Sequence, residues 1–229
     1  MSRAKVRYAL AALATLAAAP LSAQTTVVDE GSFRLSIRGT PVGTETFAIR
    51  RSGTGDAATH VAQGRIALDS GEQTRALLQV EGPDLRPSAY QIEVTGPEKQ
   101  SIRGQAAGNR FRATIVSTAG ETMREYIASE GAIVLDDGVA HQYFFLAAAA
   151  PEGGRVPIII PRQSRQISAT VTTNGTETIR VAGVAVSARR LVVEPAGLAR
   201  RLVWIDDQGR VLRLEIPDES FIAERTALP

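Results

Sequence analysis

The segment FRLSIR, residues 33–38, alternates apolar and polar side chains at every position. A period of two is typical of a β-strand that buries one face and exposes the other. The same alternation recurs at residues 90–95, 110–115 and 167–172. Antiparallel sheets tolerate one solvated face, whereas parallel sheets are usually covered on both faces. The repeated pattern therefore predicts a mostly all-β protein built from an antiparallel sheet.

Turn-forming residues divide the chain into short segments. Gly, Pro, Asn and Asp recur about every 8–12 residues, the spacing expected between antiparallel strands. Asn174-Gly175 predicts the tightest hairpin, because a type I′ turn requires two residues that tolerate positive φ. The segment DDQG at residues 206–209 predicts another hairpin tip. It is not expected to bind calcium, because its acidic residues lack the spacing of an EF-hand loop.

One apolar segment breaks this rhythm. Residues 139–150 are followed by Pro151, which predicts a helix of about three turns. Asp136 and Asp137 precede the segment and are expected to cap the helix. From Tyr143 onward the segment is apolar on nearly every side, so the helix should be buried. A buried helix in a β-protein predicts a strongly curved antiparallel sheet, or an incompletely closed barrel, with this one short helix on its concave side.

The first 23 residues have the features of a signal peptide. Arg3, Lys5 and Arg7 precede an apolar stretch at residues 9–21, and Ala23 is a small residue suited to cleavage. The stretch is shorter than the roughly 20 residues that a membrane-spanning helix needs. The chain has no cysteine, which excludes a lipid-modified N-terminus and disulfides. We predict a signal peptide at residues 1–23 and a single β-rich exported domain at residues 24–229. This domain should have no transmembrane span after cleavage and should be periplasmic or secreted.

The charge balance changes when the signal peptide is removed. The full chain has 26 basic and 24 acidic residues. Without Arg3, Lys5 and Arg7, 23 basic residues remain against 24 acidic ones. Nucleic-acid-binding domains usually combine a clustered basic patch with a net positive charge. Basic and acidic residues alternate along this chain, so we expect no nucleic-acid partner.

The sequence offers few groups for catalysis or metal binding. His60 and His141 are its two histidines, and neither lies in a zinc-binding motif. The chain has no phosphate-binding glycine loop and no G-x-S-x-G nucleophile motif. Asp137 and His141, four residues apart on one helix face, leave an acid–base pair open as an alternative to helix capping. We expect no enzyme activity, no cofactor and no metal.

Two motifs are similar to known proteins. The opening motif is Phe33-x5-Gly39-x3-Gly43, and the closing motif runs from Trp204-x-Asp206-x2-Gly209 to Ala223-x-Arg225. They resemble exported bacterial domains of unknown function with a curved antiparallel sheet. The architecture of those domains is similar to that of the periplasmic lipoprotein carrier and acceptor proteins, LolA and LolB. The resemblance implies an exported half-barrel that handles a hydrophobic ligand, and it implies no catalytic residues.

The leading functional prediction is a non-enzymatic periplasmic binding or carrier module. An apolar or lipid-like ligand would lie in the concavity of the curved sheet. The predicted cavity wall consists of apolar side chains of the helix, of the run VPIIIP at residues 156–161 and of a late strand, namely Tyr143, Phe144, Phe145, Leu146, Ile159 and Trp204. Prolines bracket the run at 156–161, so it is either a buried edge strand or an apolar lip at the cavity mouth.

The alternative is a structural or protein-interaction module of the cell envelope. In that case the concave side is completely packed, and edge strands or an Arg-rich face contact an envelope protein. Trp204 then belongs to the core. Whether the concave side is hollow or filled distinguishes the two hypotheses.

Overall fold

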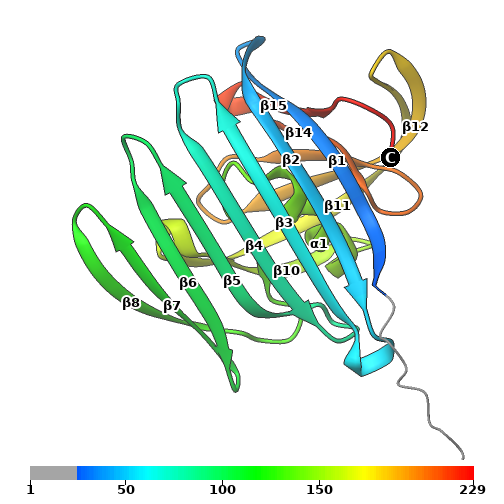
Figure 1. The fold of residues 1–229 in the computed structure, drawn as a ribbon. Helices are drawn as coiled ribbons and strands as arrows, with labels where there is room; N and C mark the ends of the chain where they lie inside the picture. Colours follow the sequence, from blue (N-terminus) through cyan, green and yellow to red (C-terminus); the bar gives the residue numbers. More distant parts are fainter. Residues whose placement is uncertain (1–24) are drawn as a thin grey trace, which may run out of the picture.

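Fifteen strands form one sheet in the computed structural model of the protein, which describes residues 25–229 (Figure 1). The first eight strands are β1 (Thr26–Ile37), β2 (Thr40–Ser52), β3 (Thr59–Leu68), β4 (Gln73–Glu81), β5 (Arg86–Thr95), β6 (Gln100–Ala107), β7 (Arg110–Ser117) and β8 (Gly120–Ile127). The other seven are β9 (Ile133–Val134), β10 (Gly154–Ile160), β11 (Arg165–Val181), β12 (Val184–Pro195), β13 (Arg201–Ile205), β14 (Val211–Ile216) and β15 (Phe221–Arg225). The predicted signal peptide, residues 1–23, lies outside the described residues.

The strand order follows the chain with one exception. Across the sheet the order is β8-β7-β6-β5-β4-β3-β2-β1-β15-β14-β13-β12-β11-β10-β9. The ladders are antiparallel, apart from the short parallel pair β9 and β10. The exception is the pairing of the first strand with the last, in which Phe33 lies opposite Arg225 and Ile37 opposite Phe221. The two ends of the described chain therefore meet in the middle of the sheet.

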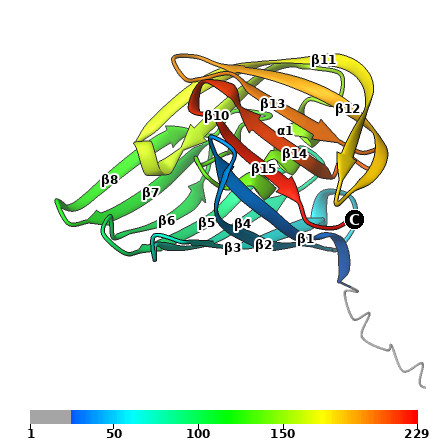
Figure 2. The same ribbon diagram turned by 90° about the horizontal axis from the view of Figure 1, so that it is seen from above.

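The sheet folds over around one short helix. The chain makes a 3₁₀ turn, η2 (Ala140–Gln142), which continues into helix α1 (Tyr143–Ala149). Figure 2 shows β2–β8 on one side of α1 and β10–β13 on the other. The edge strands β8 and β9 do not pair, so the sheet does not close into a barrel. The predicted fold class, a strongly curved and unclosed antiparallel sheet with one short buried helix, is confirmed.

The alternation in the sequence corresponds to the two faces of the sheet. On β5, Tyr90, Ile92 and Val94 are buried against the concave side, whereas Gln91 and Glu93 are exposed on the outer face. This pattern is expected when one face of an antiparallel sheet covers the core. The core therefore lies between the two halves of the folded sheet.

The N-terminal cap of the helix differs from the prediction. Neither Asp136 nor Asp137 caps it; the carboxylate of Glu45 on β2 accepts hydrogen bonds from the backbone N–H groups of Ala140 (2.8 Å) and His141 (2.9 Å). Asp136 follows β9 and Asp137 lies in the turn before the 3₁₀ turn, where other donors bind their carboxylates. The expected capping role is therefore wrong, and a strand distant in sequence supplies the cap.

The predicted hairpin at Asn174-Gly175 is also wrong. Both residues lie within β11, where the ladder with β12 shifts register. Gly175 has a φ of +69°, so its tolerance of positive φ serves a β-bulge. The turn lies at Ala182-Gly183, and both of these residues have positive φ, as a type I′ turn requires.

The proline-bracketed run is a buried strand next to the sheet edge. It forms most of β10, whose outer neighbour β9 pairs only with Ile158 and Ile159. Pro157 lies just outside that pairing, so its missing N–H removes no hydrogen bond to β9. Of the two interpretations left open by the sequence, the structure agrees with the buried strand.

Candidate functional site

Five of the predicted cavity-wall residues lie in the main hydrophobic core. Phe145, Leu146 and Ile159 are completely buried, and Tyr143 and Phe144 are 4% and 8% exposed. The rings of Phe144 and Phe145 pack edge to face, with centroids 5.4 Å apart. The helix thus fills the concave side with its own side chains. A role of these residues as ligand contacts stays a prediction.

Trp204 lies apart from the helix. Its neighbours Val203 and Ile205 belong to the main core, and side chains alternate along a strand, so Trp204 faces the other side of the sheet. There it belongs to a second, smaller cluster, with Val181, Ala188 and Leu212. The expectation that Trp204 and the helix border one apolar space is therefore corrected, because the sheet itself separates them.

A buried polar pair joins β2 to the start of the helix. The side chains of Glu45 and His141 are fully buried, and Nδ1 of the histidine lies 2.6 Å from Oε1 of the glutamate. The histidine ring stacks on Phe47, with centroids 5.6 Å apart and an angle of 7° between the planes. A Cβ at Gly64 on β3 would lie 2.4 Å from Cε1 of this ring. His141 is therefore enclosed on several sides and does not form the pair with Asp137 that the sequence left open.

A second buried carboxylate lies beside the first turn of the helix. The hydroxyl of Tyr90 donates to Asp136 (2.5 Å), and the backbone N–H of Arg162 donates to the other carboxylate oxygen (3.1 Å). Burial raises the pKa of Asp136 to about 6, against the opposing effects of the Tyr90 hydrogen bond and of Arg162. The neighbouring Asp137 pairs with Arg201 at 3.1 Å. These bonds fix the segment before the helix to both halves of the sheet.

An apolar pocket of about 400 Å³ opens at the end of the concave side that carries the β1–β2 and β3–β4 turns. We call it the mouth pocket. Its volume lies in the range of about 300–1,000 Å³ that is usual for small-molecule sites. Ile66 is buried, whereas Ile37 is 43% exposed, so the pocket extends from the core to solvent. The apolar lining consists of Leu35, Ile37, Pro41, Val42, Ile66, Leu68 and Phe221.

The rim of the mouth pocket is charged. Arg162, on the 3₁₀ turn η3 (Pro161–Gln163), lies on one side, and Asp69 and Glu72 of the β3–β4 turn also line the pocket. Nη1 of Arg162 donates to the backbone carbonyl of Asp137 (3.2 Å). Arg162 also lines an adjacent polar pocket of about 460 Å³. An apolar interior with a charged rim can accommodate an amphiphile whose chain points inward.

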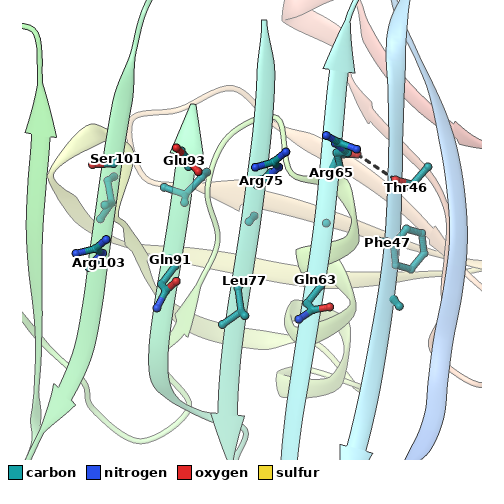
Figure 3. A pocket seen from close by; sticks show the side chains of 15 residues that line it. Thr46, Phe47, Gln63, Arg65, Arg75, Leu77, Gln91, Glu93, Ser101 and Arg103 are labelled. Carbon is teal, nitrogen blue, oxygen red and sulfur yellow. Dashed lines mark hydrogen bonds between the residues drawn. The ribbon is translucent and has the colours of Figure 1, made fainter. Parts of the chain in front are cut away.

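A different hollow, of about 760 Å³, lies on the outer face of the sheet across β2–β6 (Figure 3). We call it the outer groove. Cross-strand pairing arranges its outward-facing side chains in two rows. One row contains Thr46, Arg65, Arg75, Glu93 and Ser101, and the other contains Gln63, Leu77, Gln91 and Arg103. Most of these outward-facing side chains are polar, and the outer groove shares no lining residue with the mouth pocket.

Within residues 25–229, no group of three or more His, Asp or Glu side chains is arranged to hold a metal ion. In the same part of the chain, no helix has both the length and the apolar character needed to cross a membrane.

The likeness to known proteins is one of fold. No protein-family model and no curated protein matches the sequence. The structure is similar to a crystal structure from Brucella abortus, a β-barrel-like protein of the domain of unknown function DUF1849. The TM-score is 0.53, and the match covers 86% of this chain and 94% of that chain at 8% identity. This agrees with the expected resemblance to a β-rich domain of unknown function, and similarity to lipoprotein carriers stays a prediction.

Sequence reasoning missed the mouth pocket. Its apolar residues lie on several strands, and alternation indicates that Leu35 and Ile66 face inward without showing that they approach one another. A usable signal was the position of Ile37 and Leu68, which are apolar residues at the very ends of β1 and β3 beside polar turns. Such residues border the open end of a curved sheet.

Proposed function

We propose that the protein is a non-enzymatic binding module for an apolar or lipid-like ligand, which it holds in the mouth pocket. The observation that supports this proposal is a hollow of about 400 Å³ lined mainly by apolar side chains and open to solvent. Burial of each methylene contributes about 0.8 kcal/mol. A chain segment of eight methylenes would therefore contribute about 6 kcal/mol, before the loss of translational and conformational freedom is subtracted.

The rim favours a ligand with a particular headgroup. Arg162 carries a positive charge, whereas Asp69 and Glu72 carry negative charges. A purely anionic headgroup would be attracted by one of these side chains and repelled by two. A zwitterionic headgroup is complementary to all three, so we propose a zwitterionic amphiphile with its acyl chain in the pocket.

The proposed compartment is the periplasm or the cell exterior. The signal-peptide features of residues 1–23 support it. N-terminal sequencing of protein recovered from the periplasm is expected to show a chain that begins near Gln24. An intact Met1 on membrane-bound protein would contradict export by cleavage.

The binding proposal is tested with a fluorescent lysophosphatidylcholine analogue. We expect saturable binding to the wild-type protein and clearly weaker binding to Ile37→Trp, because the indole would occupy the opening. Ile37 is 43% exposed, so the substitution should leave the core intact. Val184→Trp is the matched control, since Val184 is 49% exposed and lies on β12, away from the pocket. Equal binding to wild type and Ile37→Trp, or no saturable binding, would refute the proposal.

A second candidate function is an interaction module of the cell envelope. The packed concave side favours it, as does edge strand β8, of which seven of eight residues are exposed. A free strand edge is a template for pairing with a strand of another protein. A photo-crosslinker at Met123, which is 69% exposed, tests this candidate in cells. Crosslinking to one defined envelope protein, together with no lipid-analogue binding, would favour it over the first candidate.

A further inference from the structure

We propose that the outer groove binds the phosphate group of a small, hydroxyl-bearing phosphate ester, and that Arg65 and Arg75 are the phosphate ligands. This site is separate from the proposed lipid site. The outer groove and the mouth pocket lie on opposite faces of the sheet and have no lining residue in common. Failure of one proposal therefore leaves the other unaffected.

The central observation is a pair of like charges. Arg65 on β3 lies directly opposite Arg75 on β4 in the ladder, which places their Cβ atoms about 4.5–5.5 Å apart. Both side chains are exposed, and within the described part of the chain neither guanidinium has a carboxylate oxygen within 4.0 Å. Like charges directly opposite each other destabilise a sheet. An anion between the two guanidinium groups would remove this repulsion.

The identity of the side chains favours phosphate. Guanidinium groups donate in a planar fork that matches phosphate oxygens bidentately. The outer groove contains a third arginine, Arg103, and a single acidic side chain, Glu93, which lies opposite Arg75. Three basic groups against one acidic group make the groove positive, although the described chain as a whole is nearly neutral. This concentration of charge attracts an anion to the groove in particular.

The remaining lining favours a small polar body. Gln63, Gln91 and Ser101 offer amide and hydroxyl groups that can donate to and accept from hydroxyls. Arg103 lies two strands and two residues from Arg75, about 12 Å away at the usual spacings within a sheet. The hollow has a volume of about 760 Å³, within the range of small-molecule sites. A hollow of this volume can accommodate a discrete small molecule.

The experiment uses glucose 6-phosphate as the probe, with inorganic phosphate and glucose as its two parts. Binding is followed by backbone amide shifts on β3 and β4 at constant ionic strength. We expect glucose 6-phosphate to bind more tightly than inorganic phosphate, and glucose not to bind. Arg65→Gln and Arg75→Gln should each weaken binding about tenfold or more, because a hydrogen bond to a charged group is lost. Arg155→Gln is the control, since Arg155 is exposed on β10 opposite Thr170 and should bind as wild type.

Thermal unfolding provides a second measurement, in which Arg65→Gln should raise stability although it weakens binding. Arg65 faces Thr46 on one side and Arg75 on the other, so Arg65→Gln removes the repulsion from its charged cross-strand neighbour. We expect this variant to have a higher melting temperature than wild type in phosphate-free buffer and to gain less from added glucose 6-phosphate. Unchanged binding in both arginine variants would overturn the proposal. So would binding to phosphatidylglycerol vesicles without binding to glucose 6-phosphate, because the groove would then recognise a membrane surface.

Discussion

The carboxylate of Glu45 and the imidazole of His141 form a hydrogen bond of 2.6 Å between two fully buried side chains. The same carboxylate accepts the backbone N–H groups of Ala140 and His141. One side chain on β2 therefore accepts hydrogen bonds from the unpaired N–H groups at the start of the helical segment and also orients the histidine ring. A strand, rather than the loop before the helix, decides where the helix lies in the concave side.

Replacement of Glu45 should be strongly destabilising. Glu45→Ala leaves two backbone N–H groups and the histidine ring without their partner, and each unsatisfied buried group costs about 1–3 kcal/mol. We expect the free energy of unfolding in urea to fall by about 3 kcal/mol or more, and by less in Glu45→Gln, which retains an acceptor. Glu121→Ala, at an exposed position on β8, is the control. A loss in Glu45→Ala no larger than in this control would show that the cap contributes little.

Gly64 should not tolerate a side chain. A Cβ at this position would lie 2.4 Å from Cε1 and 2.7 Å from Nδ1 of His141, and the buried ring is held by its hydrogen bond to Glu45 and by stacking on Phe47. We expect Gly64→Ala to lower the free energy of unfolding by about 1–3 kcal/mol, the usual cost of overpacking. Gln63→Ala, at the exposed position next to it, should change stability little. Equal stability of the two variants would mean that the ring can shift at low cost.

Asp136 should make stability depend on pH. Burial raises its pKa to about 6 in the folded protein, from an ordinary value of 3.8. The folded state therefore binds this proton more tightly than the unfolded chain, and the resulting stabilisation is complete below pH 3.8 and is lost as the pH rises through about 6. The difference between the two pKa values corresponds to about 3 kcal/mol in the free energy of unfolding.

Replacement of Asp136 isolates this effect. Asp136→Asn should show a smaller fall in stability than wild type when urea unfolding is measured from about pH 4 to pH 6. Asp207→Asn is the control, because Asp207 lies at an exposed turn position. If Asp136→Asn retained the wild-type slope, another group would have to supply the pH dependence.

Trp204 should matter for stability and not for the mouth pocket. The indole is 6% exposed and donates to Glu177, and the guanidinium of Arg213 lies 5.6 Å from the ring centroid. We expect Trp204→Ala to lower the free energy of unfolding by about 3 kcal/mol or more, with unchanged lipid-analogue binding in the fraction that remains folded. Weaker lipid-analogue binding in that fraction would place the ligand on the opposite face of the sheet.

The sequence predicted what depends on local pattern and missed what depends on distant contacts. Alternation was sufficient to predict an antiparallel sheet, and an apolar segment that ends before Pro151 was sufficient to predict a helix within residues 139–150. Glu45 lies nearly one hundred positions before the helix that it caps, so nothing near the helix indicated this role. Asn174-Gly175 was misread because two uses of positive φ, a tight turn and a bulge, leave the same local signal.

The candidate site shows the same division. The burial of Phe145 and Leu146 follows from their own segment, since a helix that is apolar all round must be covered. Which face Trp204 occupies depends on the register of β13 with its neighbours. The approach of Ile37 to Leu68 depends on the pairing of β1, β2 and β3. The arginine pair of the outer groove likewise depends on the pairing of β3 with β4.

The strand order also means that the chain can be cut between β8 and β9 without separating paired strands. Strands β1–β8 form a meander, and β9–β15 follow it with a helical crossover between the parallel strands β9 and β10. Within residues 25–229 the ladder between β1 and β15 is the one that joins the two halves. A cut in the connection at residues 128–132, between the two outermost strands, would break no ladder at all. Two separately produced fragments would each retain their ladders, and they could associate through the β1–β15 ladder and through buried contacts such as those of Glu45 with His141 and of Tyr90 with Asp136. The folded molecule thus has the organisation of two complementary fragments, and residues 128–132 connect them covalently without taking part in a ladder.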